Sequence, residues 1–194
     1  MKKEIDLTQL PQGQMPLPWL WSRIGYFSVV ALVTTMSETG HVAVEVNTWH
    51  TPIGSNLIVM QCTTYHDTYK NIRCCGEFVF NYPTVDIIPA VIKAGRDKRG
   101  ATLNEVEAIG LTPIPAMLVR PPRIAECTAH VECRLISHRA TEVRQRGELV
   151  VIVGQVVAAS VEDVDDIYKG RILYTESDYY APCPVDRLAR WPEE

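Results

Sequence analysis

Hydrophobic and polar residues alternate along several stretches of the chain, which is the pattern of β-strands with one buried face. The clearest alternation runs through residues 123–136, where every second side chain is small or apolar and the intervening ones are polar. Residues 149–161 are apolar on both faces, which predicts a strand through the centre of a barrel. Further strands, rich in β-branched and aromatic side chains, are predicted at residues 24–35, 41–49, 57–63 and 77–82.

Three short segments have helical periodicity instead. One helix is predicted to begin at Asp67 or its neighbour and to end near Gly76. A second covers residues 84–94, where Pro89 is expected to kink or shorten it, and a third covers residues 104–109. Many strands, few helices and no strict strand–helix alternation predict a mainly β fold, an antiparallel barrel with a few short inserted helices.

The 194 residues fall within the size of one domain, so we expect a single domain over residues 1–194. Three prolines make a long helix improbable in residues 1–22, which we interpret as an N-terminal arm. This arm is expected to lay its tryptophans on its own subunit or on a partner. Residues 171–194 are interpreted as a C-terminal tail.

Composition and charge exclude several classes of function. The net charge of −4 argues against nucleic acid as the main partner. No apolar run reaches the roughly 20 residues of a membrane helix, and no export signal follows the charged first residues, so no membrane association and a cytoplasmic location are expected. The six cysteines are then expected to stay reduced, and no histidine or cysteine spacing predicts a metal site.

Small polar residues gather at strand ends and at a helix start between residues 44 and 84. They are Asn47, Thr48, Thr63, Thr64, Thr68 and Asn81. Amides and hydroxyls at such places can hold a phosphate or a flat heterocycle. Structural interpretations stay open, because the asparagines can form strand-end turns and Thr68 can be an ordinary first-turn helix residue. Trp49, beside them, is more often a core residue than a platform for a ring.

Seven motifs resemble, in order, those of the flavin reductase-like, FMN-binding split-barrel family, which includes flavoredoxins and NAD(P)H:flavin oxidoreductases. They are VALVTT at 30–35, NTWHTP at 47–52, TYKNI at 68–72, GEFVFN at 76–81, GLTP at 110–113, IAEC at 124–127 and VIVGQVV at 151–157. Each is weak alone, but together they extend over roughly residues 26–180. The resemblance implies an antiparallel split β-barrel that binds FMN.

By the same resemblance, the flavin contacts would come from strand ends and from one helix start. These residues are Val46, Asn47, Thr48, Trp49, Cys62, Thr63, Thr64, His66, Thr68 and Asn81. The first four would face the uracil-like edge of the ring system, Asn81 would face the ring from the next strand, and residues 62–64 would line the ribityl chain. Thr68 and nearby amides would hold the phosphate, where the partial charge of the helix favours an anion. The nearest possible cations are His66, Lys70 and Arg73.

Aromatic residues in the arm and the tail predict a homodimer with the flavin close to its interface, because such residues are enriched at buried interfaces. They are Trp19, Trp21, Tyr174, Tyr179, Tyr180 and Trp191.

The expected function is an oxidoreductase that passes electrons from NAD(P)H or a protein donor through FMN to an acceptor. NADH-using relatives often carry Gly-Asp-His before the Val-Gly-x-Val strand, whereas this chain has Arg146-Gly147-Glu148. Glu148 would repel a pyrophosphate if it pointed inward, so slow reduction by NAD(P)H is expected, and a flavoredoxin-like electron carrier stays open. A non-redox small-ligand barrel is the third alternative. No catalytic residue is assigned, because the cofactor performs the chemistry.

Overall fold

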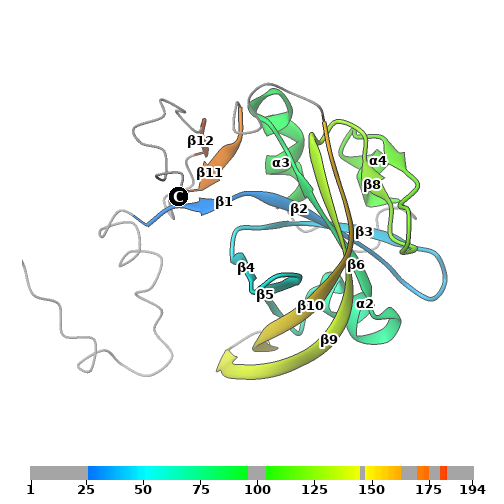
Figure 1. Ribbon diagram of the computed structural model, residues 1–194, viewed down its shortest axis with the longest axis vertical. Coiled ribbons are helices and arrows are strands. Elements are labelled where there is room, and N and C mark those ends of the chain that lie inside the picture. The colour runs from blue at the N-terminus through cyan, green and yellow to red at the C-terminus, as the bar shows by residue number, and fades with distance from the viewer. Residues whose placement is uncertain (1–25, 96–103, 145–146, 163–169, 175–179, 183–194) are drawn as a thin grey trace, which may run out of the picture.

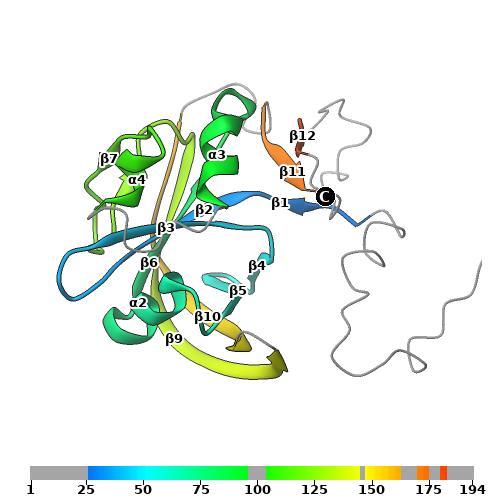
Figure 2. The same ribbon diagram turned by 180° about the vertical axis from the view of Figure 1, so that it is seen from behind.

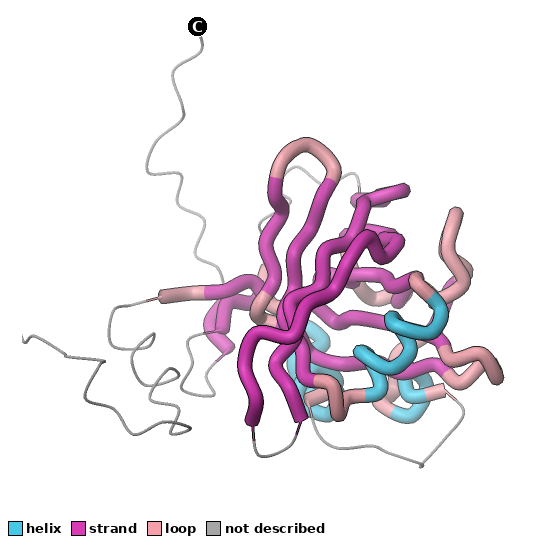
Figure 3. Tube along the Cα trace, turned by 90° about the horizontal axis from the view of Figure 1, so that it is seen from below, coloured by secondary structure: helices cyan, strands magenta, loops and turns pink. Residues whose placement is uncertain are grey.

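The computed structural model describes residues 26–95, 104–144, 147–162, 170–174 and 180–182, with backbone alone at 142–144 and 180–182. Its main element is a seven-stranded antiparallel sheet, in the order β3-β2-β6-β9-β10-β5-β4, which curls into an open half-barrel (Figures 1 and 3). The strands are β2 (Ala31–Met36), β3 (Val42–Asn47), β4 (His50–Ile53), β5 (Leu57–Thr63), β6 (Glu77–Tyr82), β9 (Ala129–Arg144) and β10 (Gly147–Val161). The predicted mainly β, antiparallel architecture is confirmed, and β10 lies between β9 and β5, inside the sheet as predicted.

Two smaller sheets flank the half-barrel (Figure 2). One joins β1 (Ser28–Val29), β11 (Ile172–Tyr174) and β12 (Tyr180–Pro182), and the other pairs β7 (Pro113–Ile114) with β8 (Arg123–Ile124). The pattern at 24–35 had predicted one strand where the structure has β1 and β2, and the strand predicted at 123–136 is divided into β8 and β9 by a turn. Ile172, in the segment interpreted as a tail, is fully buried. The predicted arm at 1–22 lies outside the described residues.

The predicted helices are present, with one modification. They are α2 (Asp67–Cys75), η2 (Val85–Ile87) with α3 (Ile88–Ala94), and α4 (Glu105–Ala108). Gly76 ends α2 in the left-handed conformation, at φ 71°, and its N–H donates to the Ile72 carbonyl oxygen. Pro89 lies in the first turn of α3, where no intrahelical N–H is needed, so the proline shortens the predicted helix without kinking it.

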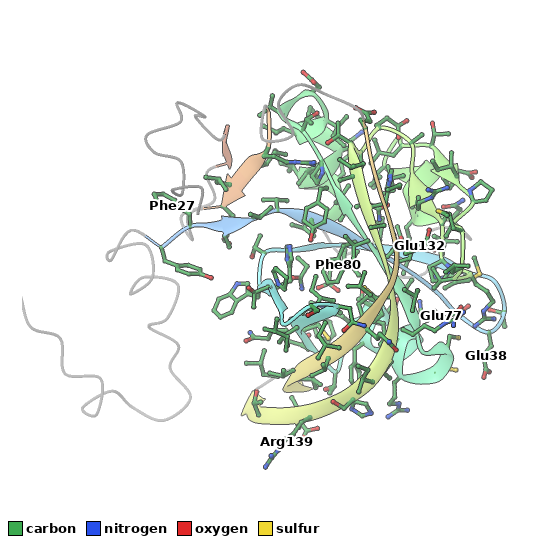
Figure 4. The ribbon with its side chains drawn as sticks, in the orientation of Figure 1. Phe27, Glu38, Glu77, Phe80, Glu132 and Arg139 are labelled. Atoms are coloured by element: carbon green, nitrogen blue, oxygen red, sulfur yellow. The ribbon has the colours of Figure 1, made fainter. Side chains whose placement is uncertain are left out.

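Strand β2 has both faces buried, because its side chains alternate between two cores. Ala31 and Val33 pack inside the half-barrel with Phe78 and Phe80, and α2 covers this core with Tyr69 and Ile72. On the other face, β2 packs with the apolar residues of α3 and α4. Figure 4 shows Phe80 within the curled sheet and Phe27 at the outer end of the chain segment leading into β1.

Strand β4 was not predicted, because the sequence pattern at Thr51-Pro52 favoured a turn. It is an edge strand that pairs only with β5 in the sheet order, and an edge is where proline is tolerated in a sheet. Two hydrogen bonds join the β3–β4 connection to β5, from Asn47 Nδ2 to the Gln61 carbonyl oxygen and from the Gln61 N–H to the Trp49 carbonyl oxygen, each at 2.8 Å. Among the described residues, no helix has the length and hydropathy needed to span a bilayer.

Candidate flavin site

A cavity of about 270 Å³ lies beside the β4 edge of the half-barrel. Its lining residues are Tyr26, Trp49, His50, Thr51, Val59, Gln61 and Val151. Aromatic and aliphatic side chains with a few polar groups are the usual lining of a site for a flat organic ligand. The volume is just below the range of about 300–1,000 Å³ that is common for such sites, so this cavity accommodates part of a large ligand rather than all of it.

Strand β5 extends the cavity toward a polar end. Val59 and Gln61 line the cavity, and Thr63 lies on the same face because side chains two apart on a strand share a face. Thr63 Oγ1 is buried and has no hydrogen-bond partner among the described residues. A buried hydroxyl without a partner is costly, and a hydroxyl of a bound ligand would satisfy it. An apolar cavity, with an unpartnered hydroxyl farther along the same face of β5, fits a flat ring carrying a polyol chain, as in a flavin.

Asn47 does not offer its side chain to a ligand. It is 6% exposed, its Nδ2 donates to Gln61, and its Oδ1 accepts from the Trp49 N–H at 3.1 Å and faces His50 Nδ1 at 3.2 Å. The polar group that reaches the cavity at this point is His50, which sequence reasoning did not select. The available signal was its place in the NTWHTP motif at 47–52, next to Trp49.

His50 is neutral at physiological pH. Burial lowers the pKa of its imidazole to about 4, an effect that a hydrogen bond with the backbone of Asn47 only partly offsets. The ring centroid lies 5.0 Å from that of Phe80 and 5.7 Å from that of Tyr82, so aromatic neighbours fix its orientation.

Asn81, which was predicted to face the ring, is buried and hydrogen-bonded within the barrel. Its side chain is 0% exposed; Nδ2 donates to the Leu32 carbonyl oxygen at 2.9 Å, and Oδ1 accepts from the Ile124 N–H at 2.9 Å. Because the Asn81 side chain is buried and both of its polar atoms have partners within the protein, it has no free group that could contact a ligand. The polar residue at the end of β6 therefore joins this strand to β2 and β8.

Two further predicted residues have side chains in the cores. Cys62 faces the inside of the half-barrel, opposite to Thr63, and burial, reinforced by the negative charge of Glu45, raises its thiol pKa to about 12. Val46 packs against the core beneath α3 and α4. Thr48 is half-buried in the connection between β3 and β4, where only its backbone and hydroxyl remain candidates for a ligand.

The start of α2 is more acidic than the sequence suggested. The His66 ring pairs with Glu45, the Lys70 Nζ lies 2.7 Å from Asp67 Oδ1, and Arg73 belongs to the last turn of the helix. Two of the three predicted cations are therefore already paired with acids, and the third is at the other end. Thr68 is only 3% exposed, so the backbone amides of the first turn are better placed than its hydroxyl to meet an anion.

Thr64 is joined to the start of β10. Its N–H donates to the Glu148 carbonyl oxygen at 2.9 Å, and its Oγ1 accepts from the Glu148 N–H at 2.8 Å. The Glu148 side chain is exposed, and it lies three residues before Val151, whose side chain lines the cavity. Leu149 and Val151 pair with Thr63 and Gln61 of β5 and share their face, so Glu148, the neighbour of Leu149, points to the opposite face of β10.

The sequence matches the model of the flavin reductase-like domain over residues 22–181. The chain belongs to the flavin reductase-like family. Membership in this family supports a flavin-related redox role, and it agrees with a cavity whose lining suits a flat ring.

The chain is also similar to a curated protein and to solved structures. An uncharacterized protein of Archaeoglobus fulgidus is 32% identical over 111 residues, which are 56% of this chain and 59% of that protein, so the chain spans little more than half of this relative. Among solved structures, a putative flavin reductase with a split-barrel domain from Shewanella frigidimarina has a TM-score of 0.79 at 21% identity, with 96% of each chain covered. The flavoredoxin of Desulfovibrio vulgaris has a TM-score of 0.71 at 18% identity, with 97% of each chain covered. These likenesses confirm the predicted split-barrel fold.

Proposed function

We propose that this member of the flavin reductase-like family binds FMN and acts as an oxidoreductase, passing electrons from NAD(P)H or a protein donor to an acceptor. The observation that carries the proposal is the apolar cavity beside β4 with the unpartnered Thr63 hydroxyl on the same face of β5. The family match over residues 22–181 supports the flavin as the ligand of this cavity.

Trp49, His50 and Thr51 would border the ring system, and Thr63 would meet the ribityl chain, because these groups line the cavity or continue its face. The amides at the start of α2 would face the phosphate. A bound flavin supplies the redox chemistry, since it takes up two electrons and releases them singly or together. The protein's own task is to hold the ring in a largely apolar site and to limit the access of water.

A homodimer is part of the proposal. The cavity is small for a whole flavin, and Tyr26, 51% exposed, lines it beside the exposed Phe27. A second copy of the chain placed against this edge would enlarge and cover the site. Among the residues that motivated the dimer in the sequence, Trp19, Trp21, Tyr179 and Trp191 lie outside the described part, and Tyr174 is half-buried in β11.

A flavoredoxin-like electron carrier is the second candidate. It is favoured by Arg146-Gly147-Glu148, which stands where NADH-using relatives often have Gly-Asp-His. The repulsion once expected from Glu148 does not support it, because that side chain is directed away from the cavity face. The missing histidine is therefore the remaining reason to expect slow reduction by NAD(P)H.

Titration of the purified protein with FMN and with FAD, followed by flavin fluorescence, tests the binding proposal. We expect FMN to bind tightly with quenching, and FAD to bind more weakly, because the start of α2 offers backbone amides for one phosphate. A protein that leaves the fluorescence of FMN unchanged would overturn the proposal. Anaerobic stopped-flow reduction of the holoprotein by NADH and NADPH then separates the two candidates, since a rate of tens per second or more is that of an enzyme.

A further inference from the structure

The hydrogen bonds of Asn47 identify the oxygen and the nitrogen of its side-chain amide. Nδ2 lies 2.8 Å from the Gln61 carbonyl oxygen, which can only accept, and Oδ1 lies 3.1 Å from the Trp49 N–H, which can only donate. The atom that faces His50 Nδ1 at 3.2 Å is therefore the amide oxygen. Because this oxygen has no proton to give, Nδ1 of His50 must carry the proton of the neutral ring.

The second ring nitrogen of His50 is consequently a hydrogen-bond acceptor. Burial keeps the imidazole neutral, with its pKa lowered to about 4, so a proton on Nδ1 leaves a lone pair on Nε2. Among the described residues, Nε2 has no protein partner, and the buried polar side-chain atoms without a partner belong to Glu45 and Thr63. Nε2 is thus accessible, on a ring that lines the cavity.

The packing of the His50 ring also fixes the direction in which Nε2 points. The ring packs against Phe80, at 5.0 Å between centroids, and Phe80 is 0% exposed within the half-barrel (Figure 4). Tyr82 packs on the same imidazole at 5.7 Å. An acceptor that is oriented before the ligand arrives loses little entropy on binding, so it discriminates sharply between ligands that have a donor at that place and ligands that lack one.

We propose that His50 Nε2 accepts a hydrogen bond from the imide N–H of the flavin ring, between its two carbonyl groups, and that Asn47 is the positioning residue that holds His50 in the required tautomer. This inference rests on the proposed function and names how that site recognises its ring. It transfers to His50 the contact that the family resemblance implied for the Asn47 side chain, whose amide is used within the protein.

Binding of FMN and of its N3-methyl derivative, which lacks the imide N–H, tests the contact. We expect the native protein to bind the methylated flavin about tenfold more weakly, the loss of roughly one hydrogen bond with a buried partner. His50→Phe keeps an aromatic ring against Phe80 but removes the acceptor, so the two flavins should then bind within about twofold of each other. The matched control is His138→Phe, at an exposed histidine of β9, which should leave the tenfold preference unchanged.

The tautomer is measured without any flavin, by ¹⁵N–¹H correlation spectra of the histidine rings in the native protein. We expect His50 to show a protonated Nδ1 and an unprotonated Nε2. Asn47→Leu removes the side-chain oxygen and leaves the backbone of residue 47 as the neighbouring acceptor, so it should lower the share of rings that carry the proton on Nδ1. Asn47→Asp keeps a side-chain oxygen there and should restore that share. A purely structural role of Asn47 would not change the tautomer.

The outcomes separate this inference from the proposal on which it rests. No binding of either flavin would overturn the proposed function. Binding of FMN and its N3-methyl derivative with equal affinity, or an unchanged preference in the His50→Phe variant, would overturn the role of His50 and leave FMN binding intact. A native spectrum with the proton on Nε2 would also overturn it, because that nitrogen could not then accept a hydrogen bond.

Discussion

Single buried polar residues hold the loops of this half-barrel in place. Glu132 on β9 is 1% exposed, and its two carboxylate oxygens accept hydrogen bonds from the backbone N–H groups of Met117 and Leu118, each at 2.7 Å. Arg123 Nε lies 3.8 Å from the same carboxylate. A carboxylate can accept from two amides at once, and here it holds the β7–β8 loop against the sheet.

Glu132→Gln is predicted to lower the free energy of unfolding by about 2–3 kcal/mol. The amide NH₂ of glutamine would face one of the two backbone N–H groups, so a buried donor would lose its partner, and Arg123 would lose a nearby anion. Urea denaturation measures the change. Glu107→Gln, at an exposed position of α4, is the matched control and should change the free energy by less than about 0.5 kcal/mol. Equal effects of the two substitutions would contradict this account of Glu132.

At the scale of elements, α2 is the helix whose start is proposed to face the phosphate of FMN. Its first turn offers backbone N–H groups and the positive end of the helix, but it also carries Asp67, with Lys70 bound to it at 2.7 Å, and Glu45 is close by through His66. The helix favours an anion, whereas the acids oppose it. The phosphate should therefore contribute less to FMN binding than it would beside an unpaired lysine.

Asp67→Asn is predicted to strengthen FMN binding by about 0.3–1 kcal/mol, because it removes a negative charge at the helix start and releases Lys70. Riboflavin has no phosphate, so its affinity should not change. Fluorescence titration of the native and Asp67→Asn proteins with both flavins measures the difference at low ionic strength. Thr68→Val should leave the affinities of both flavins unchanged, because its hydroxyl is almost wholly covered. A parallel gain for FMN and riboflavin would place the phosphate elsewhere.

The elements were predicted well from the sequence because their signals are local. The strand Glu77–Tyr82 and the helix ending before Gly76 follow from periodicity and from a left-handed glycine. Strand β4 was missed because Pro52 is a turn signal, and only the position of β4 at the sheet edge makes proline acceptable there. The roles of single site residues cannot be derived in the same way, since Asn47, Asn81 and Cys62 are polar or reactive in type but their side chains are used within the protein. Which side chains have unpartnered atoms depends on long-range contacts, as with His50 beside Phe80.

At the scale of the whole molecule, one end has apolar side chains that a single subunit leaves open to water. Tyr26, Phe27, Val29 and Ile53 are 51%, 60%, 42% and 39% exposed. The first three belong to the start of the chain described, where Figure 4 labels Phe27, and Ile53 belongs to the edge strand β4. Tyr26 also lines the cavity. Exposed apolar groups next to an incomplete site are typical of an interface that completes it.

The protein is therefore predicted to be a dimer in solution, with a mass near twice the 21.8 kDa of the chain by light scattering at micromolar concentration. Phe27→Asp places a charge among these apolar groups, so it should shift the protein toward the monomer and weaken FMN binding in the same samples. Met117→Asp is the matched control, because Met117 is 62% exposed but belongs to the β7–β8 loop, on the far side of the molecule from β1 (Figure 1). It should remain dimeric with native affinity for FMN. A native protein of monomer mass that binds FMN tightly would show that one subunit completes the site alone.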